Sequence, residues 1–154
     1  MTKIGFIGTG SMGQILIEAF LKSCTLEPAE IVIHNRTRSK AEQLVEYYPG
    51  MSVAQNNVEL VKESDIFFIC VKPLEYGNVL DEIKDVVRRD QIVVSITSPV
   101  KISDIEERLA GKVAKIVPSI TNSVLCGASL FMYGSRLTSA DRHTLFDLFS
   151  QISR

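Results

Sequence analysis

Three glycines near the start of the chain have the spacing of a phosphate-binding turn. Gly8, Gly10 and Gly13 follow a short apolar run and precede a segment with helical periodicity. In such a turn the first glycine permits a tight bend, the second lets the backbone approach a pyrophosphate, and the third lets the helix pack close to the sheet. The backbone N–H groups and macrodipole at the helix N-terminus would hold two phosphates. The pattern predicts a dinucleotide site; the alternative is that these glycines serve only a tight turn.

A second polar group follows the next expected strand. Asn35, Arg36 and Thr37 lie about 20 residues beyond the glycines, where sites that prefer NAD usually place an acidic residue for the ribose hydroxyls. An arginine there can hold a 2′-phosphate through bidentate, charge-assisted hydrogen bonds, and its two neighbours add donors. The sequence therefore favours NADP over NAD. The alternative is that Arg36 is a solvated loop charge.

A third group ends a continuous apolar run. Val71, Lys72 and Pro73 come at the carboxyl end of this expected strand, where ligands of open α/β sheets bind. The Lys72 backbone is expected to border the cofactor's ribose or nicotinamide, and its ammonium to meet a phosphate or a substrate carboxylate. The spacing is equally compatible with an exposed lysine that contacts no ligand.

An alternation of strands and helices must position these groups. The hydrophobic pattern predicts strands at 3–7, 31–34, 52–54, 66–71, 92–96, 114–117 and 129–133, and helices at 14–22, 39–48, 58–62, 76–87, 102–109 and 139–153. Parallel neighbours need a crossover between them, so this order implies a parallel sheet. We expect a Rossmann-like, doubly wound α/β fold, with a mostly parallel sheet and helices on both faces.

The bulk composition is that of one ordinary globular domain. The chain has 154 residues, 45% of them apolar, and a formal net charge of -1. The sequence has no cluster of basic residues of the kind that binds nucleic acid. The apolar runs are strand-sized, and the first strand begins too early to leave room for a signal peptide. The sequence therefore predicts a cytoplasmic protein that binds neither nucleic acid nor a membrane.

The cysteines and histidines do not suggest a metal site. Cys24, Cys70 and Cys126 are far apart, odd in number and without a C-x-x-C motif, so we expect three reduced packing residues. His34 and His143 are the only histidines, and no spacing brings cysteine or histidine ligands together.

Several segments spread along the chain share the pattern of one known family. They are Ile4 to Gly13, Asn35-Arg36-Thr37, Ser64-Asp65, Val71-Lys72-Pro73, Val93 to Ile96, Val113 to Pro118, and Gly127. Together they resemble the N-terminal domain of the pyrroline-5-carboxylate reductase family, and the Val-Lys-Pro after a buried strand is the distinctive part. The resemblance implies reduction of a cyclic imine to proline by NAD(P)H. The nicotinamide supplies the hydride, so neither a nucleophile nor a metal is needed.

The resemblance also implies roles for individual residues. Ser11 and Met12 would line the pyrophosphate turn, and Asn57 matches an asparagine near the adenosine ribose. Asn35 to Thr37 would lie at the adenosine phosphate, and Val71 to Pro73 would border the cofactor.

Two loops depart from the family's pattern. Thr97-Ser98-Pro99 stands where the reductases typically carry Ala-Ala-Gly, and Val117-Pro118-Ser119-Ile120-Thr121 stands where they carry Met-Pro-Asn-Thr-Pro. Both loops adjoin the substrate side, which makes Thr97, Ser98 and Ser119 the candidate substrate-side residues. The departures are similar to those in a reductase-like branch from the late-competence operon of spore-forming bacteria, whose members are associated with regulation.

The resemblance also bears on the rest of the protein. The family's second domain, a helical dimerisation bundle that completes the imine pocket, would begin beyond Arg154. We therefore expect this chain to be a fragment, weak in nucleotide binding and nearly inactive, of a homodimer or higher homo-oligomer. Three functions remain open: an NADPH-dependent reductase of a cyclic imine, a catalytically silent regulatory protein that keeps the nucleotide fold, or another NADP-dependent reductase related to β-hydroxy acid or prephenate dehydrogenases.

Overall fold

The computed structural model describes residues 2–96, 99–117, 120–121, 124–125 and 130–152. The strands are Ile4–Ile7 (β1), Ile31–His34 (β2), Ser52–Val53 (β3), Ile66–Ile69 (β4), Ile92–Ser95 (β5), Lys112–Val117 (β6), Ile120–Thr121 (β7), Val124–Leu125 (β8) and Leu130–Tyr133 (β9). The helices are Ser11–Lys22 (α1), Arg38–Tyr47 (α2), Asn57–Glu63 (α3), Tyr76–Ile83 (α4), Ile102–Arg108 (α5) and Ser139–Ser150 (α6), with short 3-10 turns at Pro28–Glu30 (η1) and Pro73–Glu75 (η2).

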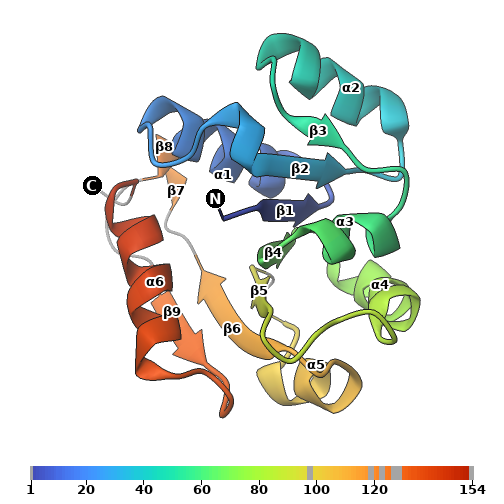
Figure 1. The fold of residues 1–154 in the computed structure, drawn as a ribbon, viewed down its shortest axis with the longest axis vertical. Coiled ribbons are helices and arrows are strands. Elements are labelled where there is room, and N and C mark those ends of the chain that lie inside the picture. Colours follow the sequence, from blue (N-terminus) through green and yellow to red (C-terminus); the bar gives the residue numbers. More distant parts are fainter. Residues whose placement is uncertain (1, 97–98, 118–119, 122–123, 126–129, 153–154) are drawn as a thin grey trace.

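The larger sheet has seven strands in the order β3-β2-β1-β4-β5-β6-β9. Its neighbours pair in parallel except β6 and β9, which are antiparallel. From β1 the chain first adds β2 and β3 on one side, and then returns to add β4, β5 and β6 on the other (Figure 1). This reversal confirms the doubly wound, mostly parallel fold. It also creates a topological switch point between the carboxyl ends of β1 and β4.

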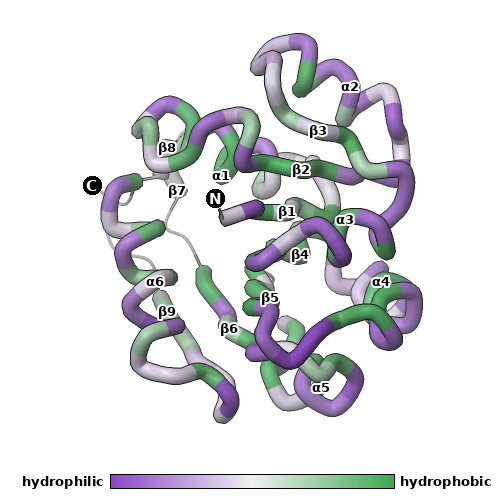
Figure 2. Tube along the Cα trace, viewed as in Figure 1, coloured by the Kyte–Doolittle hydropathy of each residue, from purple (hydrophilic) through white to green (hydrophobic). Residues whose placement is uncertain are grey.

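Helices cover both faces of the sheet, which explains why its central strands are apolar throughout. Phe6 and Phe68 pack with residues of α1, α2 and α6 on one face, whereas Phe67 and Ile69 pack with residues of α3, α4 and α5 on the other. β1 and β4 are buried at every position. Figure 2 shows the hydrophobic strand β2 beside the largely hydrophilic surface helix α2. A strand that is covered on both faces has a continuous run of apolar residues, which is the pattern from which the strand at residues 66–71 was predicted.

The structure differs from the predicted elements mainly in short segments. The hairpin of β7 and β8 was not predicted, because two residues per strand are too few to show a periodicity. Helix α4 ends at Ile83 rather than at residue 87. There the carbonyl of Ile83 accepts hydrogen bonds from the backbone N–H groups of both Val86, at 3.0 Å, and Val87, at 3.2 Å. The chain continues as a turn, and Val87 at its end stays buried.

The prediction that all three cysteines are packing residues is wrong for Cys24. This side chain is exposed, and its φ of 59° places it in the left-handed turn that follows α1. The Cys24 side chain is therefore not part of the core. Cys70 is a free thiol at the end of β4, and Cys126 lies outside the described residues.

Candidate functional site

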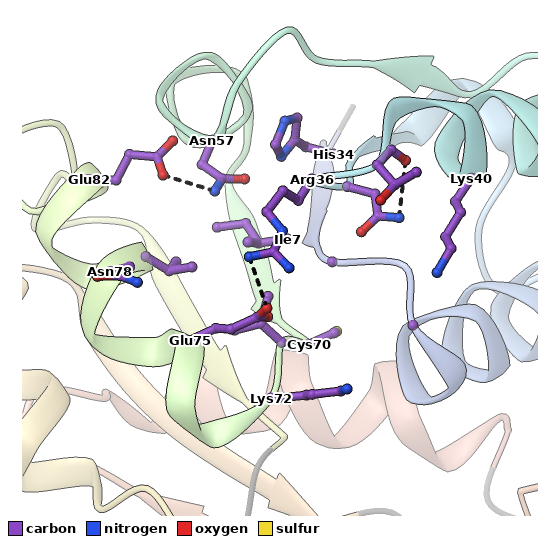
Figure 3. A pocket seen from close by; sticks show the side chains of 16 residues that line it. Ile7, His34, Arg36, Lys40, Asn57, Cys70, Lys72, Glu75, Asn78 and Glu82 are labelled. Atoms are coloured by element: carbon purple, nitrogen blue, oxygen red, sulfur yellow. Dashed lines mark hydrogen bonds and ion pairs between the residues drawn. The ribbon is translucent and has the colours of Figure 1, made fainter.

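A cleft of about 400 Å³ opens at the carboxyl edge of the sheet, at the switch point between β1 and β4 (Figure 3). Its walls come from the turn after β1, the loop after β2, the start of α3, and the stretch from the end of β4 into α4. The sequence-predicted site residues that line it are Gly8, Gly10, Asn35, Arg36, Thr37, Asn57, Val71 and Lys72. Segments more than 60 positions apart in the sequence are thus brought to one place by the parallel sheet.

The other predicted residues do not line this cleft. Ser11, Met12 and Gly13 form the first turn of α1, next to Gly10, and Pro73 opens the η2 turn that follows Lys72. The three candidate substrate-side residues, Thr97, Ser98 and Ser119, lie outside the described residues. The binding roles of all these residues remain predictions.

Two of the glycines are required by the fold itself. Gly8 has a φ of +91°, which L side chains rarely adopt, and its N–H donates to the carbonyl of His34 at 2.8 Å. A Cβ at Gly13 would stand 2.6 Å from the carbonyl oxygen of Gly8, so α1 could not pack as closely against the turn. These two positions match the first and third roles predicted for the motif.

Gly10 is different, because nothing in the described fold requires a glycine there. A Cβ at this position would meet no heavy atom within 4 Å among the described residues. Gly10 is the N-cap of α1, and within the described structure no side chain caps this helix and its first turn holds no acidic residue. Open space beside uncapped helix N–H groups is the arrangement that accepts a phosphate.

Two buried polar atoms have no hydrogen-bond partner among the described residues. They are the hydroxyl Oγ1 of Thr9 and the side-chain oxygen Oδ1 of Asn57. Asn57 lines the cleft, and Thr9 lines an adjoining hollow between α1 and α2. A buried oxygen without a partner costs free energy, which a ligand that donates a hydrogen bond would recover. The Asn57 oxygen can accept a hydrogen bond inside the cleft, which fits a ligand that carries hydroxyl groups, such as the ribose of a dinucleotide.

Arg36, in the loop after β2, lies at the mouth of the cleft. The Arg36 side chain is 88% exposed, and its Nη1 lies 3.5 Å from Oε1 of Glu75 on the opposite wall. Asn35 donates from Nδ2 to the Thr37 carbonyl at 3.2 Å, which braces the loop. Figure 3 shows Lys40 and Lys72 extending from opposite walls of the same cleft.

A buried hydrogen-bond pair supports the wall after β4. The Tyr76 hydroxyl donates to the carbonyl of Ile69 at 2.8 Å and lies 2.9 Å from Oγ of Ser95. Both side chains are buried, and they join the carboxyl ends of β4 and β5. This contact holds the strand end from which Val71 and Lys72 enter the cleft.

Sequence reasoning missed several lining residues. Lys40 comes from α2, and Glu75, Asn78, Val79 and Glu82 come from η2 and α4. The last four follow an i, i+3, i+4, i+7 spacing, which places them on one helical face. That spacing, directly after the Val-Lys-Pro segment, was the available signal.

Cys70 also lines the cleft but is a poor nucleophile. Burial raises the pKa of its thiol far above the usual range, which keeps it protonated at neutral pH. Within the described ranges no cluster of three or more histidine, cysteine or acidic side chains is arranged to hold a metal ion. In the same part of the chain, no helix has both the length and the apolar character required to cross a bilayer.

One known family pattern spans the segments that form the cleft: the glycine turn, the loop after β2 and the wall after β4. A family model described as NADP oxidoreductase coenzyme F420-dependent matches residues 3–99. The chain belongs to this family. The match covers all of the cleft residues described above.

Known relatives of this chain confirm the resemblance predicted from its motifs. The ComE operon protein 4 of Bacillus subtilis is 40% identical over 151 residues, which cover 98% of this chain and 55% of that protein. A pyrroline-5-carboxylate reductase of Methanosarcina acetivorans is 30% identical over 152 residues, covering 97% of this chain and 56% of that enzyme.

The fold has close counterparts among solved structures. The pyrroline carboxylate reductase of Plasmodium falciparum, solved with NADP bound, superimposes with a TM-score of 0.83 at 21% identity, covering 99% of this chain and 55% of that one. This likeness shows the fold alone. The chain spans about half the length of the relatives that it matches.

Proposed function

We propose that the cleft binds NADPH, and that the chain is the nucleotide-binding half of a reductase acting on a cyclic imine such as 1-pyrroline-5-carboxylate. The observation that carries the proposal is the open space at Gly10, beside the uncapped N-terminus of α1 and at the switch point of the sheet. A pyrophosphate bound there would receive hydrogen bonds from backbone N–H groups.

The preference for the 2′-phosphorylated cofactor rests on the loop after β2. Arg36, in the loop after β2, and Lys40, near the start of α2, place two cations on one wall of the cleft, and β2 ends without an acidic residue. A guanidinium can bind a phosphate through two parallel hydrogen bonds. Asn57 and Asn35 add polar groups for the adenosine ribose.

When bound, the nicotinamide supplies the hydride, and this chain's residues bind and orient the cofactor. The relative named as a pyrroline-5-carboxylate reductase, from Methanosarcina acetivorans, supports the imine as substrate. We further propose that the full-length protein is a cytoplasmic homodimer or higher homo-oligomer whose second domain completes the imine pocket.

Calorimetric titration of the chain with NADPH, NADP⁺ and NADH tests the cofactor proposal. We expect measurable binding that is tighter for the 2′-phosphorylated cofactors and that weakens as salt is raised, because Arg36 is exposed to screening ions. Absence of binding to all three would overturn the nucleotide assignment.

A regulatory protein that keeps the nucleotide site without turnover is the second candidate. The altered segment Thr97-Ser98-Pro99 and the 40% identity to the ComE operon protein 4 favour it. Assaying NADPH oxidation by the full-length protein with a panel of cyclic imines separates the two. Turnover would exclude the purely regulatory function, whereas binding of NADPH without turnover would favour it.

A further inference from the structure

The ion pair between Arg36 and Glu75 crosses the mouth of the cleft. Arg36 comes from the loop after β2, and Glu75 comes from η2 after β4, so the pair joins the two walls between which the adenosine end of a cofactor would lie (Figure 3). The separation of Nη1 and Oε1 is 3.5 Å.

The pair contributes little to the stability of the fold. The two side chains are 88% and 36% exposed, and ion pairs in such positions stabilise proteins by only about 0 to 1 kcal/mol. Its main effect is therefore on what binds in the cleft. A ligand that fills the mouth removes water from around both groups, and their charges then act at a lower effective dielectric constant.

The two cofactors differ at one position that these charges would sense. NADP carries a phosphate on the adenosine ribose where NAD carries a hydroxyl. A phosphate that binds Arg36 must compete with the Glu75 carboxylate for the same guanidinium, and it is repelled by that carboxylate. A hydroxyl has no such conflict, because it can donate a hydrogen bond to the carboxylate while Arg36 stays paired.

We propose that Glu75 sets the cofactor selectivity of this site. It supplies, from the opposite wall, the acidic group that sites preferring NAD carry at the end of the second strand. Glu75 lowers the affinity for the 2′-phosphate and supports binding of the 2′-hydroxyl form, so that the site accepts NADH as well as NADPH. This inference rests on the proposed nucleotide site.

The test is calorimetric titration of the wild-type chain and Glu75→Gln with NADPH and NADH, and with 2′,5′-ADP and 5′-AMP, which isolate the phosphate's contribution. In Glu75→Gln we expect NADPH and 2′,5′-ADP to bind about three- to tenfold more tightly, because repulsion and competition are removed. We expect NADH to bind equally or more weakly. When Glu75→Gln is introduced into a chain that already carries Arg36→Ala, the gain in NADPH and 2′,5′-ADP affinity should be smaller, because no guanidinium is left for Glu75 to pair with.

Glu42→Gln is the matched control. It removes the same charge from an exposed glutamate that pairs with Arg38 on α2 and does not line the cleft, so the ratio of the NADPH and NADH affinities should stay at the wild-type value. If Glu75→Gln still binds NADPH but keeps the wild-type ratio of NADPH and NADH affinities, the proposed role of Glu75 is overturned, while the nucleotide site itself stands. An equal shift in Glu42→Gln would assign the effect to net charge and overturn that role too. If the wild-type chain binds none of these four nucleotides, the proposed nucleotide site itself is overturned.

Discussion

A Cβ at Gly13 would stand 2.6 Å from the Gly8 carbonyl oxygen, whereas a Cβ at Gly10 would meet no described heavy atom within 4 Å. The two glycines therefore serve different purposes at the residue scale. Gly13 is required by the packing of α1 against its own turn. Gly10 keeps a space open that the described fold leaves unfilled.

This difference predicts opposite phenotypes for two matched substitutions. Gly13→Ala is expected to lower the free energy of unfolding by about 1–3 kcal/mol through overpacking. Gly10→Ala is expected to cost under about 1 kcal/mol of stability, yet to weaken NADPH binding at least about tenfold, equivalent to ~1.4 kcal/mol. Urea denaturation and calorimetry measure the two effects. Wild-type affinity in Gly10→Ala would show that no ligand approaches this position.

Arg36 carries the second residue-scale prediction. Arg36→Ala is expected to weaken NADPH binding about ten- to a hundredfold, because a charge-assisted hydrogen bond is worth ~1.5–3 kcal/mol. NADH affinity should change much less. Arg38→Ala is the control, since Arg38 is bonded to Glu42 outside the cleft. Equal losses for the two cofactors in Arg36→Ala would contradict a role in binding the phosphate.

Helix α6 shows how a single cap can join elements. Thr138 and Asp141 form a reciprocal capping box at its N-terminus, and Asp141 also bonds Lys112 of β6 at 3.1 Å. Burial alone would raise the pKa of Asp141. The Thr138 backbone N–H, the Lys112 ammonium and the Thr138 hydroxyl outweigh it, so that the pKa lies below its usual value.

The lowered pKa predicts a pH dependence of stability. Because the folded pKa of Asp141 lies below the unfolded one, its contribution is fully present above about pH 4 and is lost as the pH falls through the lowered folded value. Asp141→Asn is expected to cost about 1–2 kcal/mol near pH 7, and this cost should shrink in acid. Denaturant titrations between neutral and acid pH measure it.

Asp147→Asn is the control for that experiment. Asp147 pairs with His143 on the same helix, but both side chains are largely exposed. Its substitution should change stability by less than about 0.5 kcal/mol. A constant cost of Asp141→Asn down to acid pH would show that its charge is not what stabilises the cap.

At the scale of the whole molecule, an aromatic cluster connects the C-terminal helix to the N-terminal half. Phe149 of α6 is fully buried, with its ring centroid 5.5 Å from that of Phe20 and 5.9 Å from that of Phe68. Phe20 belongs to α1 and Phe68 to β4. The packing of α6 therefore stabilises the same strand that ends at the cleft.

Phe149→Ala is accordingly expected to lower the free energy of unfolding by about 3–5 kcal/mol. Phe146→Ala, on the same helix but 55% exposed, should cost under about 1 kcal/mol. The midpoints of denaturant unfolding compare the two. Similar small losses in both variants would show that α6 does not contribute to the common core.

The sequence alone determined the local features of this protein. Glycine spacing predicted the turn after β1, and apolar runs predicted the order of the main strands and helices, because both depend on backbone freedom and burial within a few residues. The pattern at Arg36 and Lys72 predicted two walls of the cleft. The sequence alone could not reveal that Cys24 falls in a left-handed turn, or that the two-residue strands β7 and β8 pair with each other.

Only the tertiary structure decided which side chains meet. Glu75 and Arg36 are distant in sequence, and they face each other because β4 was laid down beside β1 rather than beside β3. The orphaned oxygen of Asn57 and the open space at Gly10 are likewise properties of packing. Contacts between separate elements depend on strand order and register, which no local periodicity encodes.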